Sequence, residues 1–173
     1  MKIVKKMPVA MDWNLFKEAI TNGQLSVGDE IELDDGTVWR VLDTMDDGVL
    51  IWQHTGSDEP VRFNENGSNV YEGSDIQKYL QGDFRKIVPA ELLEMMDGDF
   101  FLLSMEEIKK YLPTEAERVA TDKNGDTVTW WTRSAYRGYA YVAWLVTAAG
   151  YASGNGACNA SRARPACKIL KSK

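Results

Sequence analysis

The sequence is poor in the residues that carry covalent or metal chemistry. It contains one histidine, His54, and two cysteines, Cys158 and Cys167. Two cysteines are too few for a disulfide framework, and whether they pair is left open. No CxxC, HExxH or similar spacing is present, so we predict no metal site. We also predict no cofactor and no catalytic residues.

Long apolar runs are missing as well. No stretch approaches the roughly 20 apolar residues that a membrane-spanning helix needs. The basic start, residues 1–8, lacks the apolar segment of a signal peptide. We therefore expect no membrane span and no export signal. A virion, a cell surface reached through a partner, and the cytoplasm stay open as compartments.

Acidic residues are missing from the last quarter of the chain. The net charge is −6, yet residues 127–173 contain no Asp or Glu and carry seven Lys and Arg. These cations are scattered and do not share one helix face, so we predict no nucleic-acid partner. The lack of carboxylates also removes the hard oxygen ligands that a calcium site would need there.

The remaining composition is typical of one globular domain. The chain has 173 residues, of which 44% are hydrophobic and 27% charged, so we predict a single domain over residues 1–173. Residues 1–26 would form an N-terminal helix and lead-in. The helix is expected over residues 12–22, with Asp12 as its cap, an apolar face that includes Phe16 and Ile20, and Gly23 at its end.

An antiparallel meander follows the predicted helix. Residues 27–33 alternate between apolar and polar side chains, and residues 38–42 and 49–53 are also strand-like. Asp-Asp-Gly turns at 34–36 and 46–48 separate the three strands. Residues 55–73 are polar and rich in Gly and Asn, and we interpret them as a loop.

The middle of the chain predicts short helices and further strands. Helices are expected over residues 74–80, 89–96 and 105–112, and the last begins with the capping-box pattern Ser104-Met-Glu-Glu107. Strands are expected over 100–103 and 127–133, with Trp130 and Trp131 pointing to opposite sides, one inward and one outward. The predicted class is α+β with a mostly antiparallel sheet.

Residues 134–167 differ from the rest of the chain. Ten of them are alanine, but Gly and Pro residues interrupt the segment at short intervals, which favours short strands and irregular loops over a helix. We expect the alanines to be small buried contacts, so Leu at Ala149 or Ala160 would overpack the fold. We expect Arg133, Arg162 and Arg164 to hold the frame by donating to backbone carbonyls.

The residues between the alanines have the composition of a binding surface. Tyrosine provides a large amphipathic contact area with few torsions to freeze, and Ser, Asn and Gly provide adaptable hydrogen bonds. A Gly/Ala-rich edge with ordinary exposed tyrosines explains the same composition. The candidate ligand-binding residues are Tyr136, Tyr139, Tyr141, Trp144, Thr147, Tyr151, Ser153, Asn155, Asn159 and Ser161.

Four short motifs occur in an order that resembles a known family. They are Trp39-Arg-Val-Leu-Asp43, Phe101-Leu-Leu-Ser-Met-Glu-Glu107, Trp130-Trp-Thr-Arg-Ser134 and Arg164-Pro-Ala166. The order is similar to that of bacterial and phage domains of unknown function with a C-type-lectin-like, formylglycine-generating-enzyme-like fold. Some members are the variable proteins of diversity-generating retroelements. The resemblance covers roughly residues 27–170.

The resemblance implies ligand binding without catalysis. In such variable proteins, mutagenesis of template adenines diversifies asparagine-type codons near the C-terminus while neighbouring positions stay fixed. Residues 134–167 look like such a segment, with alanine, arginine and Trp144 as the fixed frame. The Tyr, Ser, Asn, Gly, Thr, Val, Leu and Cys residues are reachable from an asparagine codon. The implied partner is a protein or cell-surface ligand, and the oligomeric state is left open.

Two other functions stay open. The chain could be a structural or surface component of a phage or bacterium that does not vary. It could also be an enzyme, a hydrolase or a formylglycine-generating-type oxidase, using His54 or the two cysteines. Against the oxidase, Cys158 falls at a position that the resemblance marks as variable, and the chain lacks the long body of those enzymes.

Overall fold

The computed structural model describes residues 13–172 of the chain. Its helices are α1 (Trp13–Thr21), α2 (Asp75–Gln81), α3 (Asp83–Ile87), α4 (Ala90–Met95), α5 (Met105–Tyr111) and α6 (Glu115–Arg118). The first seven strands are β1 (Glu30–Glu32), β2 (Val38–Met45), β3 (Gly48–Gly56), β4 (Val61–Arg62), β5 (Met96–Leu102), β6 (Ala120–Asp122) and β7 (Thr127–Val128). The last five are β8 (Trp130–Ala135), β9 (Val142–Val146), β10 (Ala152–Gly156), β11 (Ala160–Ser161) and β12 (Pro165–Leu170).

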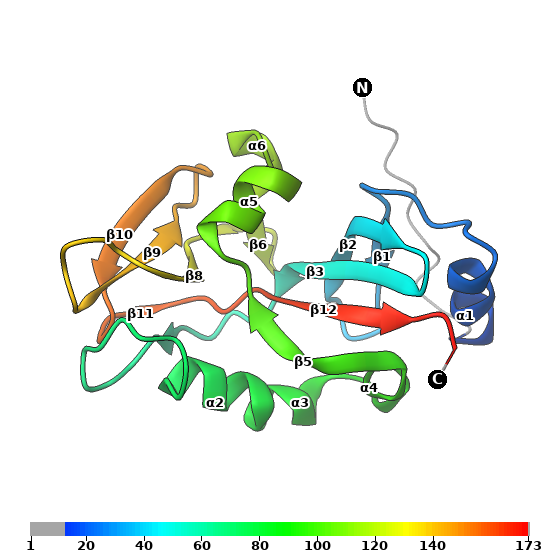
Figure 1. The fold of residues 1–173 in the computed structure, drawn as a ribbon, viewed down its shortest axis with the longest axis horizontal. Helices are drawn as coiled ribbons and strands as arrows, with labels where there is room; N and C mark the ends of the chain where they lie inside the picture. Colours follow the sequence, from blue (N-terminus) through cyan, green and yellow to red (C-terminus); the bar gives the residue numbers. More distant parts are fainter. Residues whose placement is uncertain (1–12, 173) are drawn as a thin grey trace.

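The strands form one large sheet and two small ones. The large sheet has the order β1-β2-β3-β12-β5, and β6 extends it by pairing in parallel with the end of β3 and antiparallel with β7. β12, near the C-terminus, therefore lies in the middle of this sheet, between β3 and β5 (Figure 1). A separate sheet has the order β10-β9-β8, and β4 pairs with β11. The mixture of helices and mostly antiparallel strands confirms the α+β class.

The large sheet is covered on both faces. Helices α2 to α4 run along one side of the long strands, and α5 and α6 lie on the other (Figure 1). Successive side chains of a strand point to opposite faces, so Val49 and Ile51 of β3 join one apolar cluster with α1 to α4. Leu50 and Trp52 join a second cluster with Ile108 of α5. The core thus forms two layers, one on each face of the large sheet.

Local sequence signals account for most of the elements. In α1 the face with Phe16 and Ile20 is buried as expected, whereas its predicted cap, Asp12, lies outside the described residues. Ser104 and Glu107 form the predicted capping box at α5. Both Asp-Asp-Gly turns connect antiparallel strands, and at the first turn Gly36 has a φ of 82°, which favours glycine.

Three strand predictions were wrong in extent. The strand predicted over 100–103 begins earlier, at Met96, as β5. The strand predicted over 27–33 is reduced to Glu30–Glu32, because Gly28 has a φ of 93° and a turn joins Ser26 to Asp29. The strand predicted over 127–133 is divided: β7 pairs with β6, whereas β8 pairs with β9 in the other sheet. At the break, the carbonyl of Thr129 accepts from the backbone N–H of Arg162 instead of from a strand neighbour.

The prediction for the tryptophan pair was also wrong in part. Trp130 and Trp131 do point to opposite faces of β8, but both are fully buried, because each face has its own apolar cluster. Trp131 packs against Phe63 with ring centroids 5.6 Å apart, and Trp130 packs against Trp52 at 5.1 Å. The sequence did not indicate α3, α6, β4 or β6, each of which is at most five residues long.

No helix within residues 13–172 combines the length and the apolar character that crossing a membrane requires.

Candidate functional site

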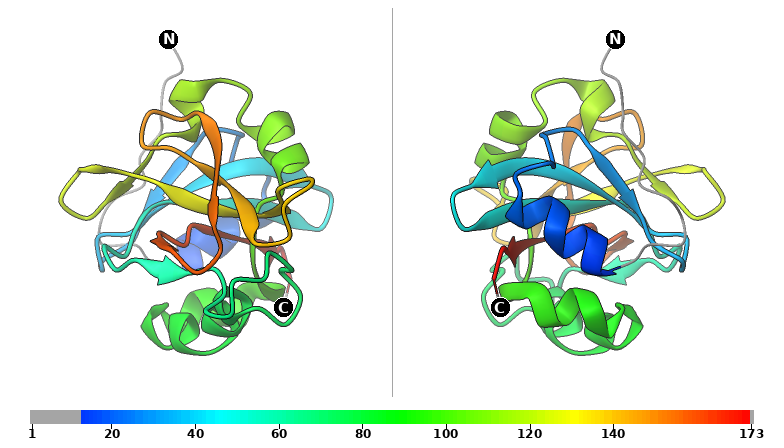
Figure 2. Two further views of the ribbon diagram at one scale, coloured as in Figure 1. Left: turned by 90° about the vertical axis from the view of Figure 1, so that its left-hand side faces the viewer. Right: turned by 90° about the vertical axis from the view of Figure 1, so that its right-hand side faces the viewer.

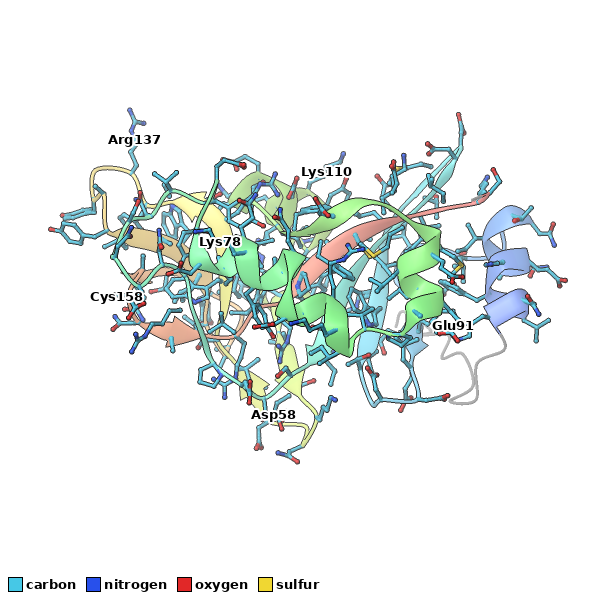
Figure 3. The ribbon with its side chains drawn as sticks, turned by 90° about the horizontal axis from the view of Figure 1, so that it is seen from below. Asp58, Lys78, Glu91, Lys110, Arg137 and Cys158 are labelled. Carbon is cyan, nitrogen blue, oxygen red and sulfur yellow. The ribbon has the colours of Figure 1, made fainter. Side chains whose placement is uncertain are left out.

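The three-stranded sheet β8–β9–β10 forms the end of the molecule opposite α1 (Figure 1), and it faces the viewer in the left view of Figure 2. Figure 3 shows Arg137 and Cys158 at the same end. β9 is the central strand, with Trp144 opposite Gly154 and Ala143 opposite Asn155. Ala143 and Leu145 face the cluster that contains Trp131, so the inner face of this sheet is part of the core.

An aromatic stack lies on the other face of this sheet. The rings of Tyr136 and Trp144 are 4.3 Å apart and inclined by 30°, and Tyr139 meets Tyr136 edge-on at 5.9 Å. The Tyr136 ring lies over Gly154, where an added Cβ would come within 2.6 Å of its Cδ2 atom. Gly154 is therefore a glycine because the aromatic ring occupies the side-chain position.

Three tyrosines at this end are strongly exposed. Tyr139, Tyr141 and Tyr151 have 54%, 63% and 60% of their surface accessible. Tyr139 and Tyr141 lie in the β8–β9 connection, whereas Tyr151 lies in the β9–β10 turn. The length of β9, about 13 Å at the usual rise per residue, separates the two turns. We call Tyr136, Tyr139 and Tyr141 the tyrosine patch; Tyr151 is outside it.

A buried asparagine holds the backbone of the tyrosine patch. The Nδ2 of Asn69 donates to the carbonyls of Tyr139 and Val142 over 2.8 and 2.9 Å, and its backbone N–H donates to Ala140. The backbone N–H of Ala157 donates to the carbonyl of Tyr141. Asn69 was not among the predicted site residues, and it lies in the polar stretch that we interpreted as a loop. Several asparagines occur there, and nothing local distinguishes the one that is buried.

An arginine–carboxylate pair anchors β8. Arg133 donates from Nη1 and Nη2 to the two carboxylate oxygens of Glu107 over 2.7 Å each, and from Nη1 to the carbonyl of Leu102 over 2.6 Å. Burial alone would raise the pKa of Glu107, but the hydrogen bonds from Arg133 and from the Ser104 backbone outweigh it and lower the pKa. The pair joins α5 to the three-stranded sheet.

We predicted that Arg162 and Arg164 donate to backbone carbonyls, and the structure confirms this for Arg164. Arg164 is fully buried and donates to the carbonyls of Ser57, Thr121 and Ala163. Burial, helped by the neighbouring Arg162 cation, lowers the pKa of Arg164 to about 10, so it stays charged at neutral pH. The Nε of Arg162 is buried and has no hydrogen-bond partner among the described residues.

The prediction that Ser161 is a ligand-binding residue was wrong. Its side chain is buried, and its hydroxyl donates to the carbonyl of Thr129 over 2.7 Å, so it is not available as a surface contact. Three further polar candidates make local hydrogen bonds. The Thr147 hydroxyl accepts from the backbone N–H of Tyr151, and the side-chain Oδ1 of Asn155 accepts from the Nδ2 of Asn159.

Ser153 and Asn155 do not share a surface with the aromatic stack of Tyr136 and Trp144. They pair with Leu145 and Ala143, whereas Trp144 pairs with Gly154. Because paired residues share a face, Ser153 and Asn155 lie on the side of the sheet away from the Tyr136–Trp144 stack. The ten candidates therefore do not form one continuous patch.

We predicted that the alanines of residues 134–167 are buried, and the structure confirms this for only some of them. Ala143, Ala157, Ala163 and Ala166 are buried. Ala149 and Ala160, which we expected to be buried, are exposed, because Ala149 lies in the β9–β10 turn and Ala160 begins the short strand β11. The exposed members of the set are Ala135, Ala140, Ala149, Ala152 and Ala160.

The two cysteines are free and differ in environment. Cys158 is exposed, whereas Cys167 is buried in β12, and burial raises the pKa of its thiol. A raised pKa disfavours the thiolate that nucleophilic or redox chemistry requires. Burial, with a smaller contribution from Arg40, lowers the pKa of His54 to about 4, so its ring is neutral at pH 7. Within residues 13–172, no three His, Cys, Asp or Glu side chains gather closely enough to hold a metal ion.

Comparison with known proteins gives one match. Residues 93–171 match a family model described as a domain of unknown function, DUF6273. The matched range begins in α4 and includes the whole three-stranded sheet, Arg133 with Glu107, and β12. Searches of curated proteins and of solved structures returned no significant match.

Proposed function

We propose that this chain is a ligand-binding protein and that the tyrosine patch is its recognition surface. The observation that carries the proposal is the contrast between exposed side chains and a held backbone. Tyr139 and Tyr141 present most of their side chains to solvent, while buried Asn69 holds the backbone carbonyls of Tyr139 and Val142. Large aromatic groups that are already ordered lose little entropy when they bind a partner.

The stack below the patch supports the same proposal. Tyr136 packs against Trp144 and over the neighbouring Gly154, and Tyr139 packs edge-on against Tyr136. Arg137 is exposed in the same connection and adds a cation to the surface. Tyrosine and arginine are the residues that dominate the energy of protein interfaces. A protein on a cell surface is the ligand class that this chemistry fits.

We further propose that the fold is C-type-lectin-like and that residues 134–167 are diversified, as in the variable proteins of diversity-generating retroelements. The exchangeable positions would be the exposed ones that an asparagine codon can reach and that carry a side chain beyond alanine, namely Tyr139, Tyr141, Tyr151, Cys158 and Asn159. Arg137 is also exposed but, as an arginine, would belong to the frame. The frame would be Arg133, Trp144 and the buried alanines. Buried Ser161, which an asparagine codon can also produce, would belong to the frame by its position in the structure.

Diversification is tested in the DNA around the gene. We expect a near-copy of the segment encoding residues 134–167 beside a reverse transcriptase gene, differing mainly at adenines. The differences should fall at the codons for Tyr139, Tyr141 and Tyr151 and should spare those for Ala143 and Ala157. A neighbourhood without such a copy, or differences spread equally over buried codons, would contradict diversification but leave ligand binding intact.

Binding is tested with intact cells. The labelled wild-type protein is titrated onto cells of the encoding bacterium or, for a phage gene, of the phage's host. We expect saturable adsorption that falls at least tenfold in the Tyr139→Ser/Tyr141→Ser variant. The matched control, Leu15→Ser/Val27→Ser, removes equally exposed apolar groups outside the three-stranded sheet and should adsorb like wild type. Absence of saturable adsorption, or equal losses in both variants, would refute a cell-surface ligand for the patch.

A further inference from the structure

Strand β10 has a free edge. It is an outer strand of the three-stranded sheet, and among residues 13–172 it pairs with β9 alone. Figure 1 shows it on the outer side of β9, at the end of the molecule. A free edge presents backbone N–H and C=O groups that can pair with another strand. Natural proteins usually protect such edges with charged side chains, proline, bulges or a covering segment.

The alternation of hydrogen bonds shows which residues of β10 offer these groups. At the two ends of the β9–β10 pair, the backbone N–H of Thr147 donates to the carbonyl of Tyr151, and that of Ala157 donates to the carbonyl of Tyr141. Both bonds are in register with the residue pairs of the two strands. Bonded and non-bonded pairs alternate in an antiparallel ladder. The odd-numbered residues of β10 therefore direct their backbone groups toward β9, and the even-numbered ones direct theirs outward.

Two of the outward residues are free to pair. They are Ala152 and Gly154, which are both exposed, and no hydrogen bond within residues 13–172 engages their outward backbone groups. The third, Gly156, is engaged, because its N–H donates to Oδ1 of Asn155 and its carbonyl accepts from the backbone N–H of Asn159. The available edge is therefore centred between Ala152 and Gly154.

β10 has none of the usual protections. No charged residue occurs over residues 138–161, and β10 contains no proline. Its register with β9 continues from end to end without a bulge. The outer strands of the large sheet differ, since β1 carries Glu30 and Glu32 and β5 carries Asp97 and Asp99.

The opposite edge of the three-stranded sheet, β8, is covered by neighbouring backbone. The backbone N–H of Trp131 donates to the carbonyl of Arg162, and that of Arg133 donates to the carbonyl of Leu103. Of the two edges of this sheet, β10 is therefore the one that stays open to another strand.

Charge and side-chain size favour a second copy of this chain as that strand. Each copy has a net charge of −6, and a net charge of one sign keeps copies apart. The uncharged stretch of residues 138–161 is where two copies can meet without bringing like charges together. The Tyr136 ring occupies the side-chain position of Gly154, so a small residue such as Ala152 of a second copy fits opposite Gly154, beside the ring.

We propose that β10 of a second copy pairs with this edge, antiparallel and around a two-fold axis. One register uses both free residues. In it, Ala152 of each copy lies opposite Gly154 of the other, and the two Ser153 residues face each other on the axis. Each Ala152–Gly154 pair exchanges N–H···O=C bonds in both directions. The two three-stranded sheets then form one continuous antiparallel sheet, as an isologous dimer.

This pairing places both tyrosine patches on one side of the dimer. The two-fold axis is perpendicular to the joined sheet, so the aromatic stacks of the two copies lie on the same face. Two binding surfaces that face the same way hold a cell surface more tightly than one does. This consequence rests on the proposed function, whereas the pairing of β10 does not.

The test measures association of the full chain by sedimentation velocity from micromolar to millimolar concentrations. The interface is a single short strand pair, and small interfaces are weak. We therefore expect a monomer at the lowest concentrations and an average mass that rises toward twice 19.5 kDa at the highest.

Amide hydrogen exchange, followed residue by residue by NMR over the same concentrations, locates the interface. The amides of Ala152 and Gly154 should exchange several-fold more slowly as the concentration rises. Those of Ser153 and Asn155 should not change, because β9 already accepts from them in the monomer.

Variants tie the association to the edge. Ala152→Lys places a charge on it, and Ala152→Pro removes an N–H that the ladder with β9 does not use. Each should raise the dissociation constant at least tenfold. Ala135→Lys makes the same change of charge at an exposed alanine of β8 and should associate like wild type. Tyr139→Ser/Tyr141→Ser should also associate like wild type. If Ala152→Pro does not fold, Ala152→Lys and the exchange data decide.

Three results would overturn the proposal. A wild type that stays monomeric up to millimolar concentration would leave the edge to a strand of a different protein. Unchanged association in both Ala152 variants would place the interface outside β10. Loss of association in Tyr139→Ser/Tyr141→Ser would mean that the copies meet through the tyrosine patch. Loss of cell adsorption in that variant with association intact would leave the pairing of β10 standing.

Discussion

At the scale of single residues, burial controls the chemistry that the few reactive side chains can perform. His54 lies next to Trp52 in an edge-on arrangement with ring centroids 6.0 Å apart, and its Nδ1 is 3.1 Å from the hydroxyl of Thr55. Charges around it oppose each other, since Arg40 lowers its pKa and Glu30 raises it. Burial decides the balance, so the folded protein keeps this ring neutral where an unfolded chain would protonate it.

The neutral state of His54 makes stability depend on pH. The pKa of His54 is about 4 in the folded protein and about 6.5 in an unfolded chain. Between these values the unfolded state binds more protons, so the free energy of unfolding falls as the pH drops from 6.5 to 4. We expect the wild type to lose about 2–3 kcal/mol more than His54→Gln between pH 7.5 and 4.5.

Chemical denaturation of both proteins at the two pH values measures this difference. The comparison isolates the contribution of His54, because every other ionisable side chain is present in both proteins. Parallel losses in wild type and variant would show that His54 is solvated in the folded state.

At the scale of elements, the three-stranded sheet depends on one side chain from a distant loop. Asn69→Ala removes both hydrogen bonds to the carbonyls of Tyr139 and Val142 and leaves these acceptors without their donor. We expect a loss of about 1–3 kcal/mol in the free energy of unfolding. We also expect faster amide hydrogen exchange over residues 136–142, with little change in the large sheet.

Asn66→Ala is the matched control for this prediction. Asn66 is an exposed asparagine of the same loop, and its side chain accepts only from the backbone N–H of Ser68. Hydrogen exchange over residues 136–142 should be the same in Asn66→Ala and wild type. Equal acceleration in both variants would mean that the loop as a whole, and not Asn69, orders the tyrosine patch.

The same element shows where sequence reasoning reached its limit. The meander, the capped helices α2 and α5, and the short strands of 134–167 follow from turn, capping and propensity signals that act within a few residues. The change of sheet at Thr129 does not, because it depends on the backbone of Arg162, 33 residues away. The burial of Asn69 depends in the same way on a connection about 70 residues later.

At the scale of the whole molecule, the alanines of residues 134–167 show why the exposure of a side chain was harder to predict than the secondary structure around it. Ala143 and Ala157 are buried because their strand and turn face the core, whereas Ala149 and Ala160 have the same side chain in exposed positions. Residue type alone does not distinguish the two pairs. The exposure of Tyr139 and Tyr151 was easier to predict, since each follows a glycine in the connection between two strands.

Leucine substitutions at the two pairs of alanines separate the frame from the surface. Ala143→Leu and Ala157→Leu insert atoms into a filled core, so each should cost about 1–3 kcal/mol in the free energy of unfolding. Ala149→Leu and Ala160→Leu place the same atoms in solvent and should stay within about 0.5 kcal/mol of wild type, as should Tyr139→Ser/Tyr141→Ser.

Thermal and urea unfolding of the five proteins measure these costs. The order matters more than the magnitudes, because the recognition surface proposed above requires that exposed residues be exchangeable while buried alanines are not. If the double tyrosine variant lost as much stability as Ala143→Leu, the tyrosines would be part of the core's support. A surface of that kind could not tolerate the sequence exchange that diversification demands, and the proposed function would lose its physical basis.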